Sequence, residues 1–210
     1  MFRFVMSIRK YSRMNKNLQV KVKSKFSFYP VTQKNWKDFE KLFGEKGACA
    51  GCWCMFWKLP RKDFTAGQGD SNRLAQKAFV TSHGTPGLLA YVDGVPVGWI
   101  AVEPRSEYPG LARSRVLAPL DETAVWSVTC FFVAKKYRRQ GLTVGLLKAA
   151  VEFVRLKGGQ VVEGYPVEPK QEKTAPVFIY TGVSSAFLQA GFTEAGRRSA
   201  TRPIMRFIIE

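Results

Sequence analysis

The sequence has little histidine, little cysteine and no long hydrophobic run. Its 210 residues include one histidine and four cysteines. The longest uninterrupted apolar stretch, Cys52 to Trp57, is far shorter than the roughly 20 residues that a transmembrane helix needs. Glycine and proline follow no collagen-like period, and no internal repeat is present. These absences exclude membrane-spanning, fibrous and repeat proteins, and the 46% apolar content predicts one soluble globular domain.

Acidic residues are missing from the first 37 positions, which carry ten lysines and arginines. The rest of the chain contributes only +7 of the net charge of +17, so the basic excess is concentrated at the N-terminus. We expect residues 1–25 to form a poorly ordered basic arm and residues 26–210 to form the domain. The arm could alternatively be an organellar transit peptide, or the chain could truly start at Met6 or Met14.

Three of the four cysteines lie close together, at Cys49, Cys52 and Cys54, and the fourth is Cys130. A structural zinc site needs four ligands, and the chain offers no second cysteine pair. A redox Cys-x-x-Cys would begin a helix after a strand, whereas glycine and tryptophan here indicate a packed loop. We therefore expect reduced thiols lining a core or pocket, no metal site and a cytoplasmic protein.

Hydrophobic periodicity predicts an α/β chain (α+β mixed sheet), with a central mixed β-sheet flanked by helices on both faces. The clearest hairpin joins two apolar runs through Asp93-Gly94, and the clearest helix carries one polar stripe, Lys148, Glu152 and Arg155. Ser71 is the expected cap of the second helix. The expected strands are 25–31, 87–92, 95–102, 125–133, 160–165 and 204–209, and the expected helices are 33–43, 72–82, 143–157 and 183–190.

The most informative segment runs from Val133 to Leu147, where a buried strand leads through a basic turn with Gly141 into the longest helix. The first N–H groups of a helix have no internal partner, and the helix dipole is positive there. Gly141 and Gly145 allow the backbone to approach an oxyanion, and Arg138 adds charge. This pattern predicts a phosphate or pyrophosphate site. Neither a Walker loop nor a dinucleotide fingerprint is present.

The segment resembles the acetyl-CoA loop of the GNAT acetyltransferase superfamily, through Val133, Arg138, Gly141 and Leu146-Leu147. The later Gly191-Phe192 is similar to the end of the family's closing helix, and the resemblance covers about residues 26–210. It implies an N-acetyltransferase that uses acetyl-CoA as co-substrate. The implied donor-binding residues are Phe132, Val133, Arg138, Arg139, Gln140, Gly141, Thr143, Val144 and Gly145.

The sequence also departs from the family pattern. Lys135 replaces the usual proline, and Thr143 replaces the second glycine of the loop, although its hydroxyl could bond a phosphate oxygen. Phe187 stands where many members place a tyrosine that protonates the departing thiolate. The resemblance leaves Tyr180 as the preferred acid, with Glu103 and Glu163 as further catalytic candidates.

The resemblance implies that the partner is an amine-bearing acceptor, a small molecule or a peptide, whose identity the sequence does not give. Trp53, Phe56 and Trp57 are candidates for stacking on it or for a satellite core. Membrane and nucleic acid are not expected partners, and a homodimer is left open. The alternatives are a CoA-binding protein that has lost its chemistry and a basic nucleic-acid-binding module.

Overall fold

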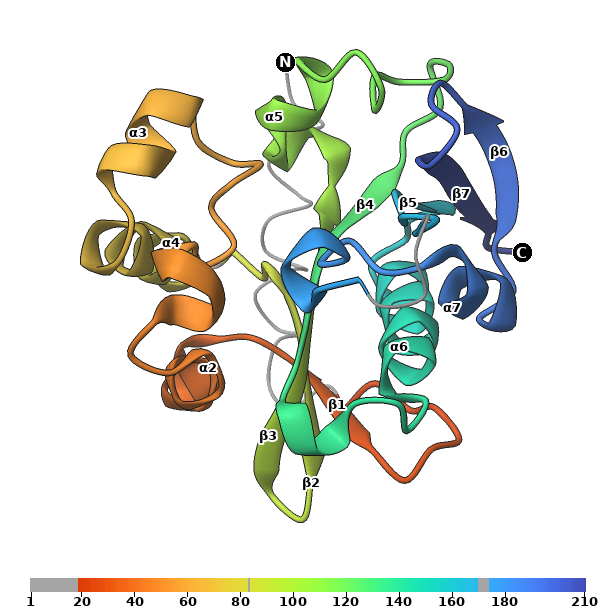
Figure 1. The fold of residues 1–210 in the computed structure, drawn as a ribbon. Coiled ribbons are helices and arrows are strands. Elements are labelled where there is room, and N and C mark those ends of the chain that lie inside the picture. The colour runs from red at the N-terminus through yellow and green to blue at the C-terminus, as the bar shows by residue number, and fades with distance from the viewer. Residues whose placement is uncertain (1–18, 83, 170–173) are drawn as a thin grey trace, which may run out of the picture.

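A computed structural model describes residues 19–82, 84–169 and 174–210 as a seven-stranded sheet with helices on both faces (Figure 1). The strand order is β1-β2-β3-β4-β5-β7-β6. All neighbouring strands are antiparallel except β4 and β5, which are parallel, so the predicted mixed sheet is confirmed. The strands are β1 Ser27–Pro30, β2 Gly87–Val92, β3 Val95–Pro104, β4 Trp126–Val133, β5 Val161–Gly164, β6 Thr193–Arg197 and β7 Pro203–Ile208.

The helices divide between the two faces of the sheet (Figure 1). On one face lie α2, α3 and α4, and on the other lie α6 and α7. Their bounds are α2 Trp36–Phe43, α3 Arg61–Ala66, α4 Asp70–Thr81, α5 Pro109–Ala112, α6 Leu142–Leu156 and α7 Ser184–Gln189. Within the described ranges, every helix is too short or too polar to cross a bilayer.

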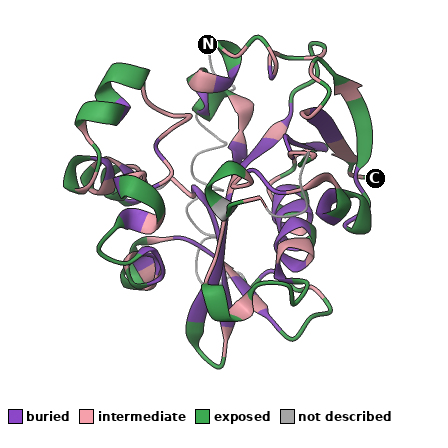
Figure 2. Ribbon diagram, in the orientation of Figure 1, coloured by how far each residue is buried: buried purple, intermediate pink, exposed green. Residues whose placement is uncertain are grey.

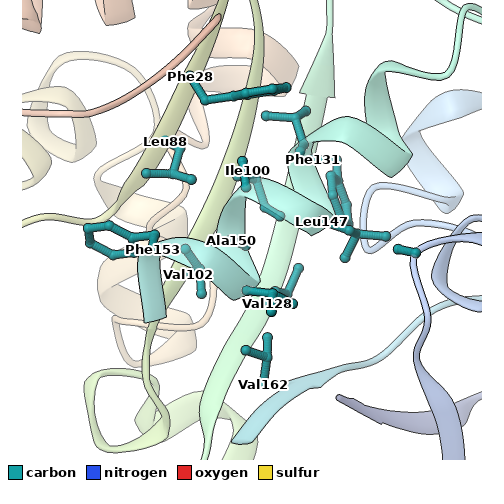
Figure 3. Packing of buried hydrophobic residues seen from close by; sticks show 14 of the residues in the cluster. Phe28, Leu88, Ile100, Val102, Val128, Phe131, Leu147, Ala150, Phe153 and Val162 are labelled. Atoms are coloured by element: carbon teal, nitrogen blue, oxygen red, sulfur yellow. The ribbon is translucent and has the colours of Figure 1, made fainter. Parts of the chain in front are cut away.

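Helix α6 forms the centre of the larger core. Much of this helix is buried (Figure 2). Leu147 and Ala150 are fully buried and pack in one cluster with Ile100 and Val128 of the sheet (Figure 3). The predicted polar stripe of this helix lies on its outer side, where Lys148 is exposed. The buried side of a long amphipathic helix therefore fixes α6, and its N-terminus, against the middle of the sheet.

The opposite face of the sheet is covered by an aromatic core. Phe39 and Phe43 of α2 contact Trp99 of β3, with ring centroids 4.8 and 6.1 Å apart. Trp53 is also buried here and stacks on Phe43 at 5.5 Å. Trp53 is therefore a core residue and is not available for stacking on a substrate.

Two local predictions are wrong. Helix α4 begins at Asp70 after Gly69, which has a left-handed φ of 97°, so Ser71 lies inside the helix and does not cap it. Strand β6 was not predicted, because its polar side chains are mostly exposed and show no alternation of apolar residues.

The N-terminal arm is described only from residue 19, and residues 1–18 lie outside the described chain. Val20 is buried, and its N–H donates to the Phe28 carbonyl at 3.0 Å. Lys25 Nζ donates to Gln140 Oε1 at 3.1 Å. Residues 20–25 thus lie against the domain, beside the turn that leads into α6.

Candidate active site

The turn between β4 and α6 is held in a fixed shape by its own side chains. Arg138 Nε donates to the Val133 carbonyl at 3.0 Å, across the turn. Arg139 and Gly141 both have left-handed backbones, with φ of 58° and 76°. Gly141 is the residue that precedes α6, so the turn directs the unpaired N–H groups of the first helical turn outward.

A cavity of about 200 Å³ opens at this point. It contains most of the donor-binding residues expected from the sequence, together with Tyr137, Leu142 and Ala186, which sequence reasoning missed. Tyr137 belongs to the basic turn and could have been found there, whereas Ala186 comes from α7 and carries no recognisable signal. The lining residues are Val133, Tyr137, Arg138, Arg139, Gly141, Leu142, Thr143, Val144 and Ala186.

The two glycines of this segment have different surroundings. A Cβ atom on Gly141 would meet no atom within 4 Å, so its missing side chain leaves the mouth of the cavity open. A Cβ atom on Gly145 would lie 3.0 Å from the Phe28 ring, which makes Gly145 a packing residue between α6 and β1. The open backbone, the helix N-terminus and two arginines fit a pyrophosphate group.

Two other residues expected to bind the donor point elsewhere. Gln140 is exposed and bonds the Lys136 carbonyl at 2.8 Å as well as Lys25. Phe132 packs its ring 5.5 Å from that of Phe43, on the α2 face of the sheet. The Ala134 N–H donates to the Val97 carbonyl on β3. Amides two residues apart on a strand point the same way, so the Phe132 amide also faces β3 and does not face the cavity.

Strands β4 and β5 pair only from Trp126 to Val128, and β4 then continues to Val133 with no strand on its β5 side, although it stays paired with β3. The segment before α7 lies beside this free edge, because the Phe131 N–H donates to the Tyr180 carbonyl at 2.6 Å. Strand alternation directs the amides of Phe131 and Val133 toward this edge. Strands β4 and β5 therefore diverge on the inner side of the cavity, and Tyr180 lies beside the part of β4 that β5 has left.

Phe187 is completely buried, and its phenyl ring carries no group that can transfer a proton. Its ring packs edge-on against Phe131 at 6.1 Å and against Phe192 at 5.1 Å. Gly164 and Gly182 leave room for it, since a Cβ atom on either would lie within 3.0 Å of the ring. The aromatic ring at this position is a core element of the closing helix.

Tyr180 lies in the segment beside the β5-facing side of β4. Its ring centroid lies 6.4 Å from that of Phe56, and it is in electrostatic contact with Cys130 on β4. Burial raises the pKa of Tyr180 to about 12, so its hydroxyl keeps its proton at neutral pH. Phe56 therefore lies beside Tyr180, whereas Trp53 is part of the core.

Glu103, near the end of β3, is buried beside Lys58, whose Nζ lies 2.6 Å from Glu103 Oε2. Burial raises the pKa of Glu103 to about 7, although the Lys58 ammonium opposes the rise. Tyr108 is in electrostatic contact with both Glu103 and Cys54, and Cys54 with Cys130. Glu103 and Tyr108 are buried and Cys54 and Cys130 are partly buried, and together they form a polar line from Glu103 toward Tyr180.

Glu163 lies in a different environment. Its two oxygens accept hydrogen bonds from Arg105 at 3.0 Å and Arg206 at 2.8 Å, and the Tyr165 hydroxyl adds a third at 2.7 Å. The oxygens of this carboxylate are therefore occupied by side chains of the protein and do not face a substrate. The structure gives Glu163 the role of joining β5 to β7 and to the end of β3.

The cysteines are free thiols, with Cys49 exposed and the other three partly buried. Cys54 Sγ accepts a hydrogen bond from Trp99 Nε1 at 3.1 Å. In the described part of the chain, no group of three or more histidine, cysteine or carboxylate side chains is arranged to hold a metal ion.

We predict that the purified protein contains well under one zinc ion per chain. A chelator should leave its melting temperature unchanged, because the residues that the structure describes form no metal-binding cluster. Elemental analysis and a melting curve with excess chelator test this. One equivalent of zinc, with unfolding on its removal, would contradict the prediction.

Comparison with known proteins identifies the family. The model of the acetyltransferase (GNAT) family matches residues 53–178, more than half of the chain. Among curated proteins, no sequence matches this one. Solved structures of low identity share the fold, among them ribosomal-protein-S5-alanine acetyltransferase from Vibrio fischeri, with 11% identity, a TM-score of 0.52 and coverage of 91% of this chain and 97% of that one.

Two further structures are similar to the same degree. An acetyltransferase of the GNAT family from Listeria monocytogenes has 9% identity, a TM-score of 0.52 and coverage of 88% of this chain and 95% of that one. A protein from Salmonella typhimurium, solved with its cofactor acetyl-CoA, has 13% identity, a TM-score of 0.52 and coverage of 89% and 95%. The family match includes the cavity-forming turn between β4 and α6. The chain therefore belongs to the acetyltransferase (GNAT) family and is an acyltransferase by class.

Proposed function

We propose that this protein transfers the acetyl group of acetyl-CoA to the amine of a small molecule or peptide. The observation that carries the proposal is the cavity at the first turn of α6, with Gly141 open to it and Arg138 and Arg139 on its wall. Family membership supports the reaction class. Acetyl-CoA supplies an activated thioester and a pyrophosphate whose charge suits this turn.

The donor would be held in two places. Arg138, Arg139 and the amides of Thr143 and Val144 would bind the pyrophosphate. The amide of Val133, on the side of β4 where β5 no longer pairs, would take the thioester end, next to the Phe131 amide that the Tyr180 carbonyl occupies. Holding the thioester at a fixed edge beside the amine is itself a large part of catalysis.

Two side chains of the chain are proposed to move protons. The attacking amine must be neutral, and Glu103, reached through the polar line, would accept its proton. Tyr180, which stays protonated at neutral pH, would donate a hydrogen bond to the leaving thiolate. Glu163 is not proposed for either role, because both of its oxygens are occupied by arginines.

The Glu103 role predicts a specific pH profile. The rate should rise with pH through a pKa near 7, because the carboxylate form is the base. Lys58→Met should move this limb to higher pH, since the Lys58 cation lowers the pKa of Glu103. Glu107→Gln should move it slightly lower, since the Glu107 charge raises that pKa. Profiles of kcat/KM that do not respond to these changes would exclude Glu103 as the base.

Release of free CoA thiol from acetyl-CoA, measured over amino acids, polyamines, aminoglycosides and peptides, tests the proposed function directly. Stabilisation of the fold by acetyl-CoA alone provides a second readout. No stabilisation and no thiol release with any amine would refute the proposal. Binding of a nucleic acid that weakens steeply with salt would instead favour the basic-module alternative.

A CoA-binding protein without activity is the second candidate, and the buried Phe187 supports it, since the position that carries a proton donor in many relatives cannot act here. The two candidates differ in one measurement. Both predict stabilisation by acetyl-CoA, and only the enzyme releases thiol faster when an amine is added.

We further propose that residues 26–210 form one acetyltransferase domain preceded by a basic arm. The free cysteines support a reducing, cytoplasmic compartment. Limited proteolysis would test the domain boundary, because an ordered segment resists cleavage.

A further inference from the structure

Arg202, which lies just before β7, differs from the other partly buried arginines of the domain. Arg105 and Arg206 are held by Glu163, and Arg73 by Glu40. Arg202 makes one long hydrogen bond, from Nη1 to Thr181 Oγ1 at 3.3 Å. Among the residues that the structure describes, no carboxylate lies within ion-pair distance of it.

The surroundings of Arg202 lead to the reaction site. Thr181, its hydrogen-bond acceptor, is fully buried and follows Tyr180 in the segment beside the free edge of β4. Arg202 is in electrostatic contact with Tyr180, and burial lowers the pKa of its guanidinium. The guanidinium therefore lies next to the proposed proton donor, on the side reached by Phe56.

A partly buried cation without an anion is costly to keep in a protein. A guanidinium group is planar and binds a carboxylate through two parallel hydrogen bonds, so it is suited to an anionic ligand. The phosphates of the donor have their own cations, Arg138 and Arg139, at the other end of the β4 edge. An anion bound at Arg202 would therefore come from a ligand group other than the donor phosphates.

We propose that Arg202 binds a carboxylate of the acceptor, so that the preferred acceptors are amines that also carry a carboxylate group, as amino acids do. This inference rests on the proposed function. With the carboxylate on Arg202, the rest of the same molecule would lie beside Thr181 and Tyr180, the residues that Arg202 contacts. The aromatic wall at Phe56 and Tyr180 would enclose the part of the acceptor between its two charged groups.

The experiment compares acceptors in pairs that differ only in the carboxylate: lysine with cadaverine, and tyrosine with tyramine. The wild-type protein should favour the carboxylate-bearing member of at least one pair by tenfold or more in kcat/KM. Arg202→Gln should reduce this preference at least tenfold, with the KM for acetyl-CoA unchanged, and Arg202→Lys should keep part of it. Arg198→Gln is the matched control, because Arg198 is exposed and bonds the carbonyls of Ala118 and Pro119, away from Tyr180.

Each outcome decides the inference. Thiol release without a carboxylate preference in the wild type overturns it and leaves the proposed function intact. An unchanged preference for carboxylate-bearing acceptors in Arg202→Gln also overturns it. So does an Arg202→Gln variant that only has a lower melting temperature and acetylates all acceptors equally more slowly. If that variant does not fold, the wild-type ratios and Arg202→Lys still test the proposal. No thiol release with any amine, and no stabilisation by acetyl-CoA, refutes the proposed function and the inference together.

Discussion

Gly141→Val should abolish the stabilisation of the fold by acetyl-CoA. Valine at this position would place two methyl groups at the open mouth of the cavity, where the pyrophosphate would bind. In the wild type, ligand at about 100 times its Kd should add about 2.7 kcal/mol to the free energy of unfolding. For a chain of this length, that corresponds to a rise of roughly 5–10 °C in melting temperature.

The control for Gly141→Val is Gly158→Val. Gly158 follows α6 at its other end and has a φ of 78° against 76° for Gly141, and a Cβ atom added to it would likewise meet no atom within 4 Å. The two variants therefore impose the same backbone strain and should lower the melting temperature of the free protein by similar amounts. Only Gly141→Val should lose the response to acetyl-CoA. An equal response in both variants would place the pyrophosphate elsewhere.

Much of the fold could be predicted because the relevant signals are local. The Asp93-Gly94 turn fixes the β2–β3 hairpin, and the one-sided polar stripe of α6 fixes both the helix and its buried face. The resemblance of the β4–α6 turn to a known loop indicated most of the residues that line the cavity. Strand β6 lacks such a signal, since an exposed edge strand needs no alternation of apolar residues.

The site could be predicted only in part, because it is assembled from distant segments. Nothing near Glu163 in the sequence shows that Arg206 will lie 2.8 Å away and neutralise it. The spacing of the sequence motif places Gly145 in the donor-binding loop. In the structure, however, the Phe28 ring of β1 fills the space where a side chain of residue 145 would be. Arg202 could not be singled out among 33 lysines and arginines, since what distinguishes it is the lack, among the described residues, of a carboxylate partner in three dimensions.

Tyr180→Phe should lower kcat while the KM for acetyl-CoA stays nearly constant. A proton or hydrogen-bond donor to the leaving group acts on the charge that develops in the transition state and contributes little to ground-state binding. Positioned acid catalysis is typically worth about 10²–10⁴-fold. The structure places the effect near the lower end of this range, because burial raises the pKa of Tyr180 to about 12.

The expected loss lies at the lower end of this range because the Tyr180 hydroxyl is a weaker acid than the CoA thiol. A thiol such as that of CoA has a pKa of roughly 8.5, so full transfer of the Tyr180 proton to a free thiolate is uphill. The hydroxyl can still donate a hydrogen bond that strengthens as negative charge builds on the sulfur, and removing one such donor from an enclosed site costs about 10²-fold. We therefore expect a loss of about 10²-fold in kcat.

The control for Tyr180→Phe is Tyr29→Phe, on β1, where the ring packs edge-on against Tyr91 at 5.6 Å and takes no part in the site. That variant should keep kcat within about twofold, as is usual for a substitution far from the reacting groups. Steady-state kinetics with acetyl-CoA varied at saturating acceptor separates kcat from the KM for acetyl-CoA. A loss below tenfold in kcat for Tyr180→Phe would mean that water protonates the thiolate and that the enzyme works chiefly by positioning the amine against the thioester.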